Sequence, residues 1–130
     1  MASEKKYKIL IVDDDNFLID MYALKFSQSN FDVHTALGPD IALEQLRGGL
    51  SPDIILVDVV MPKMDGFELL EKINQSRLAG GACRIILSNR GQKSDIERGI
   101  ELGAAGYIVK ASATPSEVIT KVLEIVNKKK

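Results

Sequence analysis

The stretch Ile54-Ile55-Leu56-Val57-Asp58 is an apolar run that ends abruptly in a carboxylate. Turn-forming residues enclose it, since Ser51-Pro52-Asp53 comes before it and Met61-Pro62 comes shortly after it. A short, β-branched run between such residues predicts a fully buried strand, and buried parallel strands are continuously apolar rather than alternating. Because ligands in open α/β sheets bind just beyond the carboxyl ends of the strands, we expect Asp58 to lie where the domain does its chemistry.

Three more runs predict strands, at residues 8–12, 84–88 and 106–110, and the alternating stretch 31–36 predicts a strand near an edge of the sheet. Helical patterns separate them, at residues 16–27, 38–48, 67–74, 94–102 and 115–130. Strands that alternate with helices predict a parallel sheet with helices on both faces. We therefore predict an α/β fold, a doubly wound five-stranded parallel sheet in the order 2-1-3-4-5 with five helices. Its switch point lies between the strands that end at Asp13 and Asp58.

Apolar spacing predicts which face of each helix packs on the sheet. The fourth helix is the weakest, because it contains Gly99 and has only Ile96 and Ile100 as a clear apolar pair. The last helix has two apolar rows, which form either one wide core stripe or, in part, a docking surface. The predicted inward residues of the first three helices are Phe17, Met21 and Leu24; Ile41, Leu43 and Leu46; and Phe67, Leu70 and Ile73. The two rows of the last helix are Val118, Val122, Ile125 and Ile119, Leu123, Val126.

Length and composition indicate one globular domain over residues 1–130, with flexible ends at 1–6 and 127–130. The 130 residues are 45% apolar and 27% charged, with a formal net charge of −1. This balance gives no electrostatic reason to expect nucleic acid or a membrane as a partner. Cys83 is the only cysteine, the N-terminus lacks the apolar core of a signal peptide, and no apolar run approaches the ~18 residues of a membrane span. We expect a cytoplasmic protein.

Polar residues gather at the predicted strand ends: Asp13, Asp14, Asp58, Ser88 and Lys110. Two charges ~4 Å apart repel by roughly 4 kcal/mol at an effective dielectric of ~20, so three crowded carboxylates either take up protons or recruit a cation. Mg²⁺ binds carboxylate oxygens and keeps coordination positions for water and phosphate. A metal beside a carboxylate, a hydroxyl and a lysine suits phosphoryl transfer, in which an aspartate can be the nucleophile.

Other polar residues have simpler explanations. Asp15 and Asn16 suit helix capping, and Asp14 can also serve only as a first-turn acid favoured by the helix dipole. Asp65 fits the turn before the third helix. His34 lies far from the strand ends in the predicted order, which indicates a surface or packing role.

The motifs at these strand ends are Ile9-Leu-Ile-Val-Asp-Asp-Asp15, Ile54-Ile-Leu-Val-Asp-Val-Val-Met-Pro-Lys-Met-Asp-Gly66, Ile85-Ile-Leu-Ser88 and Gly106-Tyr-Ile-Val-Lys110. Together they resemble the receiver domain of two-component response regulators, over essentially the whole chain. The resemblance implies a flavodoxin-like fold and a phosphorylatable switch rather than an enzyme. At this length we expect a stand-alone, chemotaxis-regulator-like receiver with no room for an output domain.

The resemblance also assigns roles to the matching residues. It implies that Asp58 accepts a phosphoryl group from a histidine kinase or a histidine phosphotransfer protein. The implied ligands of Mg²⁺ (or Mn²⁺), directly or through water, are Asp13, Asp14, Asp58 and the main-chain carbonyl of Val60.

The same resemblance implies how phosphorylation is read out. Lys110 would pair with the phosphoryl oxygens, Ser88 would hydrogen-bond the phosphoryl group, and Tyr107 would follow Ser88 as an aromatic switch. The switched surface would combine the fourth helix, the fifth strand and the fifth helix, a face that related receivers use for partner proteins or homodimers. The downstream protein itself is unidentified.

Three positions depart from the family pattern. Ala111 stands where the family usually has a proline joined through a cis bond, and a cis bond to a non-proline residue costs ~2.5–4 kcal/mol, which favours a trans bond here. Asn89 is larger and more polar than the very small residue usual beside Ser88. Val60, two residues after Asp58, offers only its carbonyl to a metal or an attacking water. We predict an unusual dephosphorylation rate.

Two other functions fit parts of the pattern. A degenerate receiver would bind partners without phosphorylation; Asn89 and Ala111 are compatible with it, whereas the complete acid set argues against it. A phosphatase of the haloacid dehalogenase type would need Asp13-Asp14-Asp15 as its Asp-x-Asp signature. Phe17 stands where that signature usually has Thr or Val, and no cap insertion is present.

Overall fold

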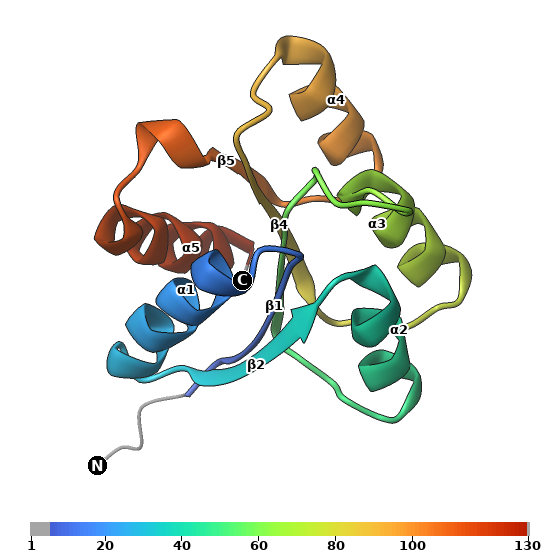
Figure 1. The fold of residues 1–130 in the computed structure, drawn as a ribbon, viewed down its shortest axis with the longest axis horizontal. Helices are drawn as coiled ribbons and strands as arrows, with labels where there is room; N and C mark the ends of the chain where they lie inside the picture. The colour runs from blue at the N-terminus through green and yellow to red at the C-terminus, as the bar shows by residue number, and fades with distance from the viewer. Residues whose placement is uncertain (1–5, 130) are drawn as a thin grey trace.

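The computed structural model describes residues 6–129, which form a five-stranded parallel sheet in the order β2-β1-β3-β4-β5 (Figure 1). Its strands are β1 Lys8–Asp13, β2 Asp32–Leu37, β3 Ile54–Val57, β4 Cys83–Ser88 and β5 Gly106–Val109. The strand order and the parallel pairing confirm the prediction from the sequence. Residues 1–5 and 130, which belong to the ends predicted to be flexible, lie outside the described residues.

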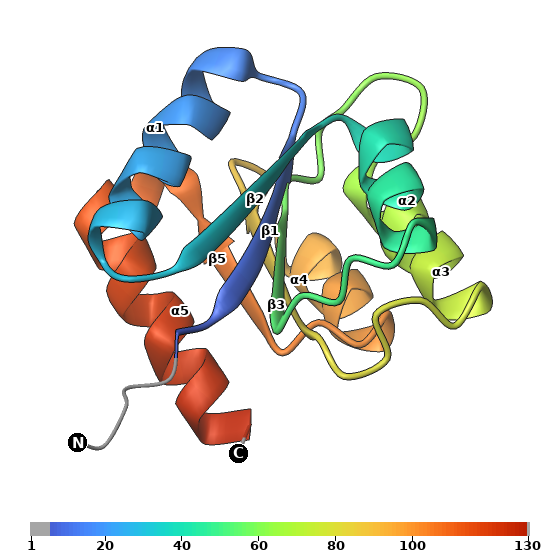
Figure 2. The same cartoon turned by 90° about the horizontal axis from the view of Figure 1, so that it is seen from below.

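Helices cover both faces of the sheet. They are α1 Asn16–Gln28, α2 Pro39–Arg47, α3 Gly66–Gln75, α4 Lys93–Glu101 and α5 Pro115–Lys129, with a short 3-10 turn, Lys110–Ser112, before α5. Figure 2 shows α1 and α5 on one face and α2, α3 and α4 on the other. This is the doubly wound, flavodoxin-like architecture expected of alternating strands and helices. No helix within residues 6–129 is both long and apolar enough to cross a membrane.

Alternate residues of the central strands point to opposite faces and build two cores. Ile54 and Leu56 join side chains of α1 and α5 in one core. Ile55 and Val57 join side chains of α2 and α3 in the other. All four are at most 1% exposed, so β3 is buried on both sides, as its uninterrupted apolar sequence predicts.

The inward face predicted for α1 is wrong at Phe17 and Leu24, whereas the third predicted residue, Met21, is partly buried and packs against the core. Phe17 is 77% exposed and Leu24 is 59% exposed, whereas Ile19, Tyr22 and Phe26 are buried in the core beneath α1. Both sets have helical spacing, so apolar periodicity alone does not decide which set faces the sheet. The buried set contains two aromatic rings, Tyr22 and Phe26, and therefore removes more apolar surface from water than a set with one ring.

The predicted faces of α2 and α3 are closer to the structure. In α2, Leu43 and Leu46 are buried, but Ile41 is 42% exposed and Ala42 faces the sheet in its place. Ala42, Leu43 and Leu46 share one face of the helix, whereas Ile41 lies two residues, about 200° around the helix, from Leu43 and so faces away from the sheet. The predicted inward face of α3 is confirmed, because Phe67, Leu70 and Ile73 are all buried.

The last two helices pack in different ways. The buried residues of α4 are Asp95 and Gly99, whereas Ile100 is 62% exposed. In α5 both predicted apolar rows contribute to one wide core stripe, which supports the simpler of the two interpretations. Val118, Ile119, Val122 and Val126 are buried, and Leu123 and Ile125 pack against the same core while partly exposed.

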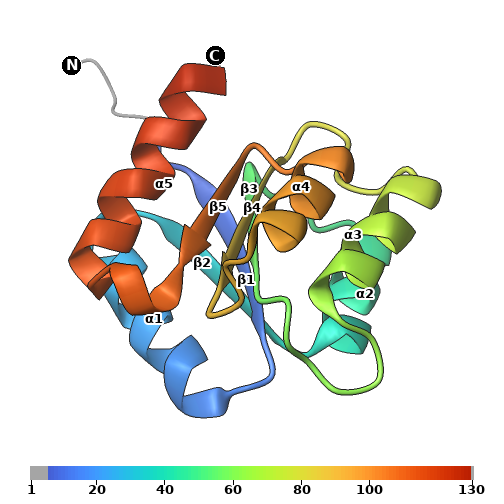
Figure 3. The ribbon, with the colours of Figure 1, turned by 90° about the horizontal axis from the view of Figure 1, so that it is seen from above.

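The start of β1 and the end of α5 lie at the amino end of the strands, opposite the carboxyl ends that carry the predicted site (Figures 2 and 3). At the amino end of β4, the buried Arg84 guanidinium donates hydrogen bonds to the main-chain oxygens of Leu78, Ala79 and Ala82 at 3.0–3.2 Å. These bonds satisfy carbonyl groups of the connection between α3 and β4, which has no regular secondary structure to satisfy them.

Candidate functional site

The predicted acidic residues meet at the carboxyl ends of β1 and β3. Val12 and Val57 are register partners in adjacent strands, so the residues that follow them, Asp13 and Asp58, lie side by side. One carboxylate oxygen from each of Asp13, Asp14 and Asp58 lies within 4.8 Å of the other two. Asp13 and Asp58 are buried, at 4% and 7% exposure, whereas Asp14 faces solvent.

Lys110 connects the two buried carboxylates. Its Nζ lies 3.1 Å from Asp13 Oδ2 and 3.5 Å from Asp58 Oδ2. The side chains of all three residues are at most 9% exposed. Asp13 Oδ1 also accepts a hydrogen bond from the Asp15 main-chain N–H at 3.0 Å, so both oxygens of Asp13 are held in place.

Asp58 and Lys110 shift each other's pKa values. Burial raises the pKa of Asp58 and the neighbouring Asp13 raises it as well, whereas Lys110, the backbone of Val60 and the Ser88 hydroxyl lower it; the net change is upward. Burial alone would lower the pKa of Lys110, but Asp58 and Asp13 outweigh burial and raise it. At Asp58 the cost of burial therefore outweighs the attraction of the Lys110 ammonium.

This donor set fits a hard divalent cation. Three carboxylates provide oxygen ligands, and one of them faces solvent, so positions remain for water and for phosphate oxygens. Burial raises the pKa of Asp58, because water does not solvate its charged form well at this place. A bound cation would favour the ionised carboxylate.

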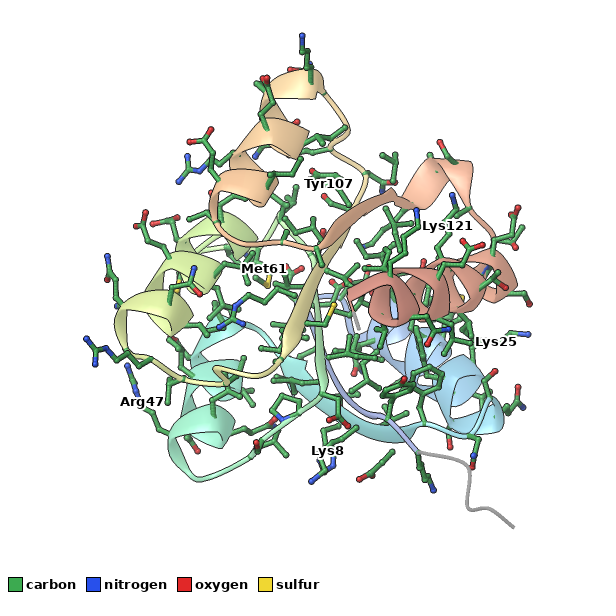
Figure 4. The ribbon with its side chains drawn as sticks, turned by 180° about the vertical axis from the view of Figure 1, so that it is seen from behind. Lys8, Lys25, Arg47, Met61, Tyr107 and Lys121 are labelled. Carbon is green, nitrogen blue, oxygen red and sulfur yellow. The ribbon has the colours of Figure 1, made fainter. Side chains whose placement is uncertain are left out.

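Ser88 and Tyr107 both contact the main chain of Arg90. The fully buried Ser88 hydroxyl accepts a hydrogen bond from the Arg90 N–H at 3.2 Å. The Tyr107 hydroxyl donates to the Arg90 carbonyl oxygen. Figure 4 labels Tyr107 on β5, where it lies beside α4. Burial and the nearby Asp95 raise the pKa of the Tyr107 phenol.

The positions that depart from the family pattern surround this site. The Val60 side chain is 55% exposed, and Asn89 and Ala111 are also exposed. No peptide bond between residues 6 and 129 is cis. The bond from Lys110 to Ala111 is therefore trans, as expected for a non-proline residue.

Several polar residues have the simpler roles that the sequence predicts. Asp15 caps α1, because its Oδ1 accepts from the Leu18 N–H at 3.1 Å. Asp65 and Glu68 form a reciprocal capping box at the start of α3, with bonds of 2.8 and 3.1 Å. His34 lies on β2, outside the acidic cluster.

Three residues near the site were not predicted from the sequence: Tyr22, Arg90 and Asp95. Tyr22 is buried on α1, and its pKa is raised because burial outweighs the opposing effect of the Lys110 ammonium. In the sequence, Tyr22 lies in one helical row with Ile19 and Phe26, and that spacing could have indicated its burial. Arg90 and Asp95 form an ion pair of 2.8 Å, for which the sequence contains no signal, because an acid in the first turn of a helix is common.

Comparison with known proteins identifies the family. Residues 9–123 match the family model of the response regulator receiver domain, so this chain belongs to that family. It is 32% identical over 121 residues to the alkaline phosphatase synthesis transcriptional regulatory protein PhoP of Bacillus subtilis, covering 93% of this chain and 49% of that protein. It is 31% identical over 123 residues to the phosphate regulon transcriptional regulatory protein PhoB of Rhizobium meliloti, covering 95% and 53%. The chain spans about half the length of these curated relatives.

A solved structure supports the same assignment. The CheY-like response regulator receiver domain protein from Methanospirillum hungatei JF-1 superposes with a TM-score of 0.84 at 26% identity, over 95% of this chain and 96% of that one. Receiver domains bind Mg²⁺ through a cluster of acidic residues, and Asp13, Asp14 and Asp58 form such a cluster here. Receiver domains act as phosphoacceptor switches, and the acidic cluster of this chain fits that activity.

Proposed function

We propose that this chain is a phosphorylation-controlled switch in which Asp58 accepts a phosphoryl group from the phosphohistidine of a histidine kinase or a histidine phosphotransfer protein. The main support is the position of the buried Asp58 carboxylate, 3.5 Å from the Lys110 ammonium and beside the acids Asp13 and Asp14. The exposed Phe17, at the start of α1 beside these acids, gives a donor protein an apolar contact.

In the proposed reaction, a carboxylate oxygen of Asp58 attacks the phosphorus atom and the phosphorus–nitrogen bond breaks. The electron pair of that bond returns to the imidazole nitrogen of the donor, and Asp58 becomes an acyl phosphate. The negative charge then lies on the phosphoryl oxygens, and Lys110 would pair with them.

We expect the site to hold Mg²⁺ or Mn²⁺ during this reaction. Its ligands would be Asp13, Asp14, Asp58 and the main-chain carbonyl of Val60, directly or through water. When bound, the metal would neutralise charge on the transferring phosphoryl group. Support for these assignments comes from the grouping of three carboxylate oxygens within 4.8 Å.

The response to phosphorylation would pass through Ser88 and Tyr107. A phosphoryl group on Asp58 would attract the Ser88 hydroxyl, which now accepts from the Arg90 N–H. A shift of Arg90 would also remove the acceptor of the Tyr107 hydroxyl. The surface formed by α4, β5 and α5 would change as a result, and it contains a groove lined in part by Tyr107, Lys121 and Ile125. Figure 4 labels Tyr107 on β5 and Lys121 on α5. We expect a downstream protein or a second copy of this chain to bind there.

The chemistry can be tested with a small phosphodonor. We expect incubation with Mg²⁺ and acetyl phosphate to add the mass of one phosphoryl group to the intact protein. Asp58→Asn and chelation of Mg²⁺ should each abolish the adduct, whereas Asp20→Asn, which changes an exposed aspartate of α1, should not. Absence of the adduct on the wild type would favour a degenerate receiver that binds partners without phosphorylation.

The same assay gives the phosphoryl lifetime after the donor is removed. We expect Asn89, Val60 and Ala111, which surround the site in exposed positions, to tune this lifetime. Asn89→Ala should change the half-life of the adduct, because Asn89 follows Ser88 and carries an amide beside the phosphoryl position. An unchanged half-life would show that Asn89 does not tune the lifetime of the phosphoryl group.

A further inference from the structure

We propose that Asp95 is a positioning residue for the switch pair Ser88 and Tyr107, and that it acts through Arg90. The inference rests on the proposed function, because it concerns how readily that switch rearranges. Asp95 itself touches neither Asp58 nor the acidic cluster among the interactions of the described residues.

The Asp95 carboxylate fastens the connection between β4 and α4 to the helix. Its Oδ1 accepts from Arg90 Nη2 at 2.8 Å, and its Oδ2 accepts from the Gln92 N–H at 3.2 Å. Asp95 is only 6% exposed, so these bonds form in a partly desolvated place. Hydrogen bonds to an ionised and buried carboxylate are stronger than ordinary ones.

Arg90 passes this constraint to both switch residues through its main chain. The Arg90 N–H donates to the Ser88 hydroxyl at 3.2 Å, and the Arg90 carbonyl accepts from the Tyr107 hydroxyl. The Arg90 guanidinium also lies 5.9 Å from the centre of the buried Phe67 ring. Arg90 is therefore held by an acid on α4 and a ring on α3, and it holds one residue of β4 and one of β5.

Apolar packing does little to fix α4 in its present position. Ile100 is 62% exposed, and the buried residues of α4 are Asp95 and Gly99. Gly99 lies against Ile86 and Tyr107: a Cβ atom there would be 2.7 Å from Ile86 Cδ1 and 3.3 Å from Tyr107 Cδ2. With so little apolar area at stake, the polar bonds of Asp95 decide much of where the connection and the first turn of α4 lie.

The arrangement before phosphorylation therefore depends on Asp95. The Ser88 hydroxyl must leave the Arg90 N–H to reach a phosphoryl group, and the bond between Arg90 and Asp95 opposes any movement of Arg90. Removing the negative charge of Asp95 weakens this opposition and shifts the population toward the rearranged loop. Asp95 thus sets how much of the free energy of phosphorylation is used to move the loop.

The first test uses the Asp58→Asn protein, which keeps the fold but offers no phosphoacceptor. We expect Asp95→Asn to speed amide hydrogen exchange in residues 88–95 about tenfold, since a charge-assisted bond is lost. Arg90→Met should have a similar effect, and the double variant should exceed neither single variant, because both remove the same interaction. Glu97→Gln also removes one negative charge from α4, but from an exposed side chain, so it should leave the exchange rates unchanged.

Three outcomes of this test would overturn the inference. They are unchanged exchange in Asp95→Asn, additive effects in the double variant, and a uniform acceleration that also includes α3, which would indicate general destabilisation. The Asp58→Asn background keeps this test independent of phosphorylation.

The second test measures phosphoryl uptake from acetyl phosphate in the protein that retains Asp58. We expect Asp95→Asn to take up the phosphoryl group several-fold faster than the wild type, with Glu97→Gln at the wild-type rate. Uptake at the wild-type rate in Asp95→Asn would overturn the inference. Absence of uptake by every variant would defeat the proposed function alone, because the exchange result stands without it.

Discussion

The helices α3 and α4 lie on the same face of the sheet, beside the same site, and are attached in different ways. α3 buries a continuous apolar face and begins with a reciprocal capping box. α4 buries an acid and a glycine, and of its two isoleucines Ile96 is half-buried and Ile100 is exposed. The buried residues of α3 are Gly66, Phe67, Leu69, Leu70 and Ile73, and those of α4 are Asp95 and Gly99.

This difference separates a fixed element from one that is able to move. Apolar contact is non-directional and depends on total buried area, so it resists the removal of a whole helix. Hydrogen bonds and ion pairs are directional and are lost after small displacements. A helix attached chiefly by such bonds has a small number of discrete positions, and α4 meets that description whereas α3 does not.

The largest expected effect compares the same substitution in the two helices. Ile73 is fully buried in α3, and Ile100 is 62% exposed in α4. Ile73→Ala should lower the free energy of unfolding by about 3 kcal/mol, whereas Ile100→Ala should change it by less than about 0.5 kcal/mol. Urea unfolding followed by circular dichroism measures both. Losses of similar size would remove the distinction between the helices.

A second pair of substitutions compares the two helical glycines. A Cβ atom on Gly66 would overlap the main-chain oxygen of Asp58 and lie 2.9 Å from Val59 Cα, so backbone must move. On Gly99 the closest atom would be Ile86 Cδ1 at 2.7 Å, the end of a side chain. Gly66→Ala should cost about 2 kcal/mol.

Gly99→Ala should cost less than about 1 kcal/mol, because the gain in helix propensity offsets part of the overlap. Thermal unfolding of both variants at one pH gives the comparison. A larger loss for Gly99→Ala would show that α4 is packed as rigidly as the turn before α3.

The smallest expected effect is a gain in stability, and it concerns Asp58, which directly follows β3. Because burial raises the pKa of Asp58, its ionised form is less favourable in the folded protein than in the unfolded chain. The resulting destabilisation is absent below the ordinary value of 3.8, develops as the pH rises from there to the raised pKa of the folded state, and is complete above it. Asp58→Asn should therefore raise the free energy of unfolding at pH 7 in the absence of metal.

Urea unfolding in a chelator at pH 7 and at pH 4 measures this gain, which should shrink at the lower pH. Mg²⁺ should then stabilise the wild type more than Asp58→Asn, because binding to the folded state raises its stability. Asp20→Asn serves as the control for removal of one exposed carboxylate. A gain independent of pH would contradict the assignment to Asp58 ionisation.

The strands and the residues at their ends were predictable, because their signals are local. A continuous apolar run such as Ile54–Val57 has one interpretation when a carboxylate and a turn follow it. Parallel pairing then brings Asp13, Asp58 and Lys110 to one end of the sheet without further information. The side chains that meet there are separated widely in sequence, and topology alone unites them.

The orientation of α1 and the contacts of Asp95 were not predictable for physical reasons. Two apolar rows with the same period run along α1, so periodicity alone does not decide between Phe17 and Phe26. Asp95 has the composition of an ordinary first-turn acid. Its burial depends on Arg90, whose position is determined by the turn after β4 and by the ring of Phe67.

The placement of the first strand and the last helix has a practical consequence for handling the protein. Lys8 begins β1 and Lys129 ends α5 at the end of the sheet opposite Asp58. A fusion whose linker continues from the start of β1 or from the end of α5 would therefore leave from the far side of the domain. Immobilised in this way, the molecule would present its acidic end to a kinase in solution, so donor binding could be measured without cutting the fusion.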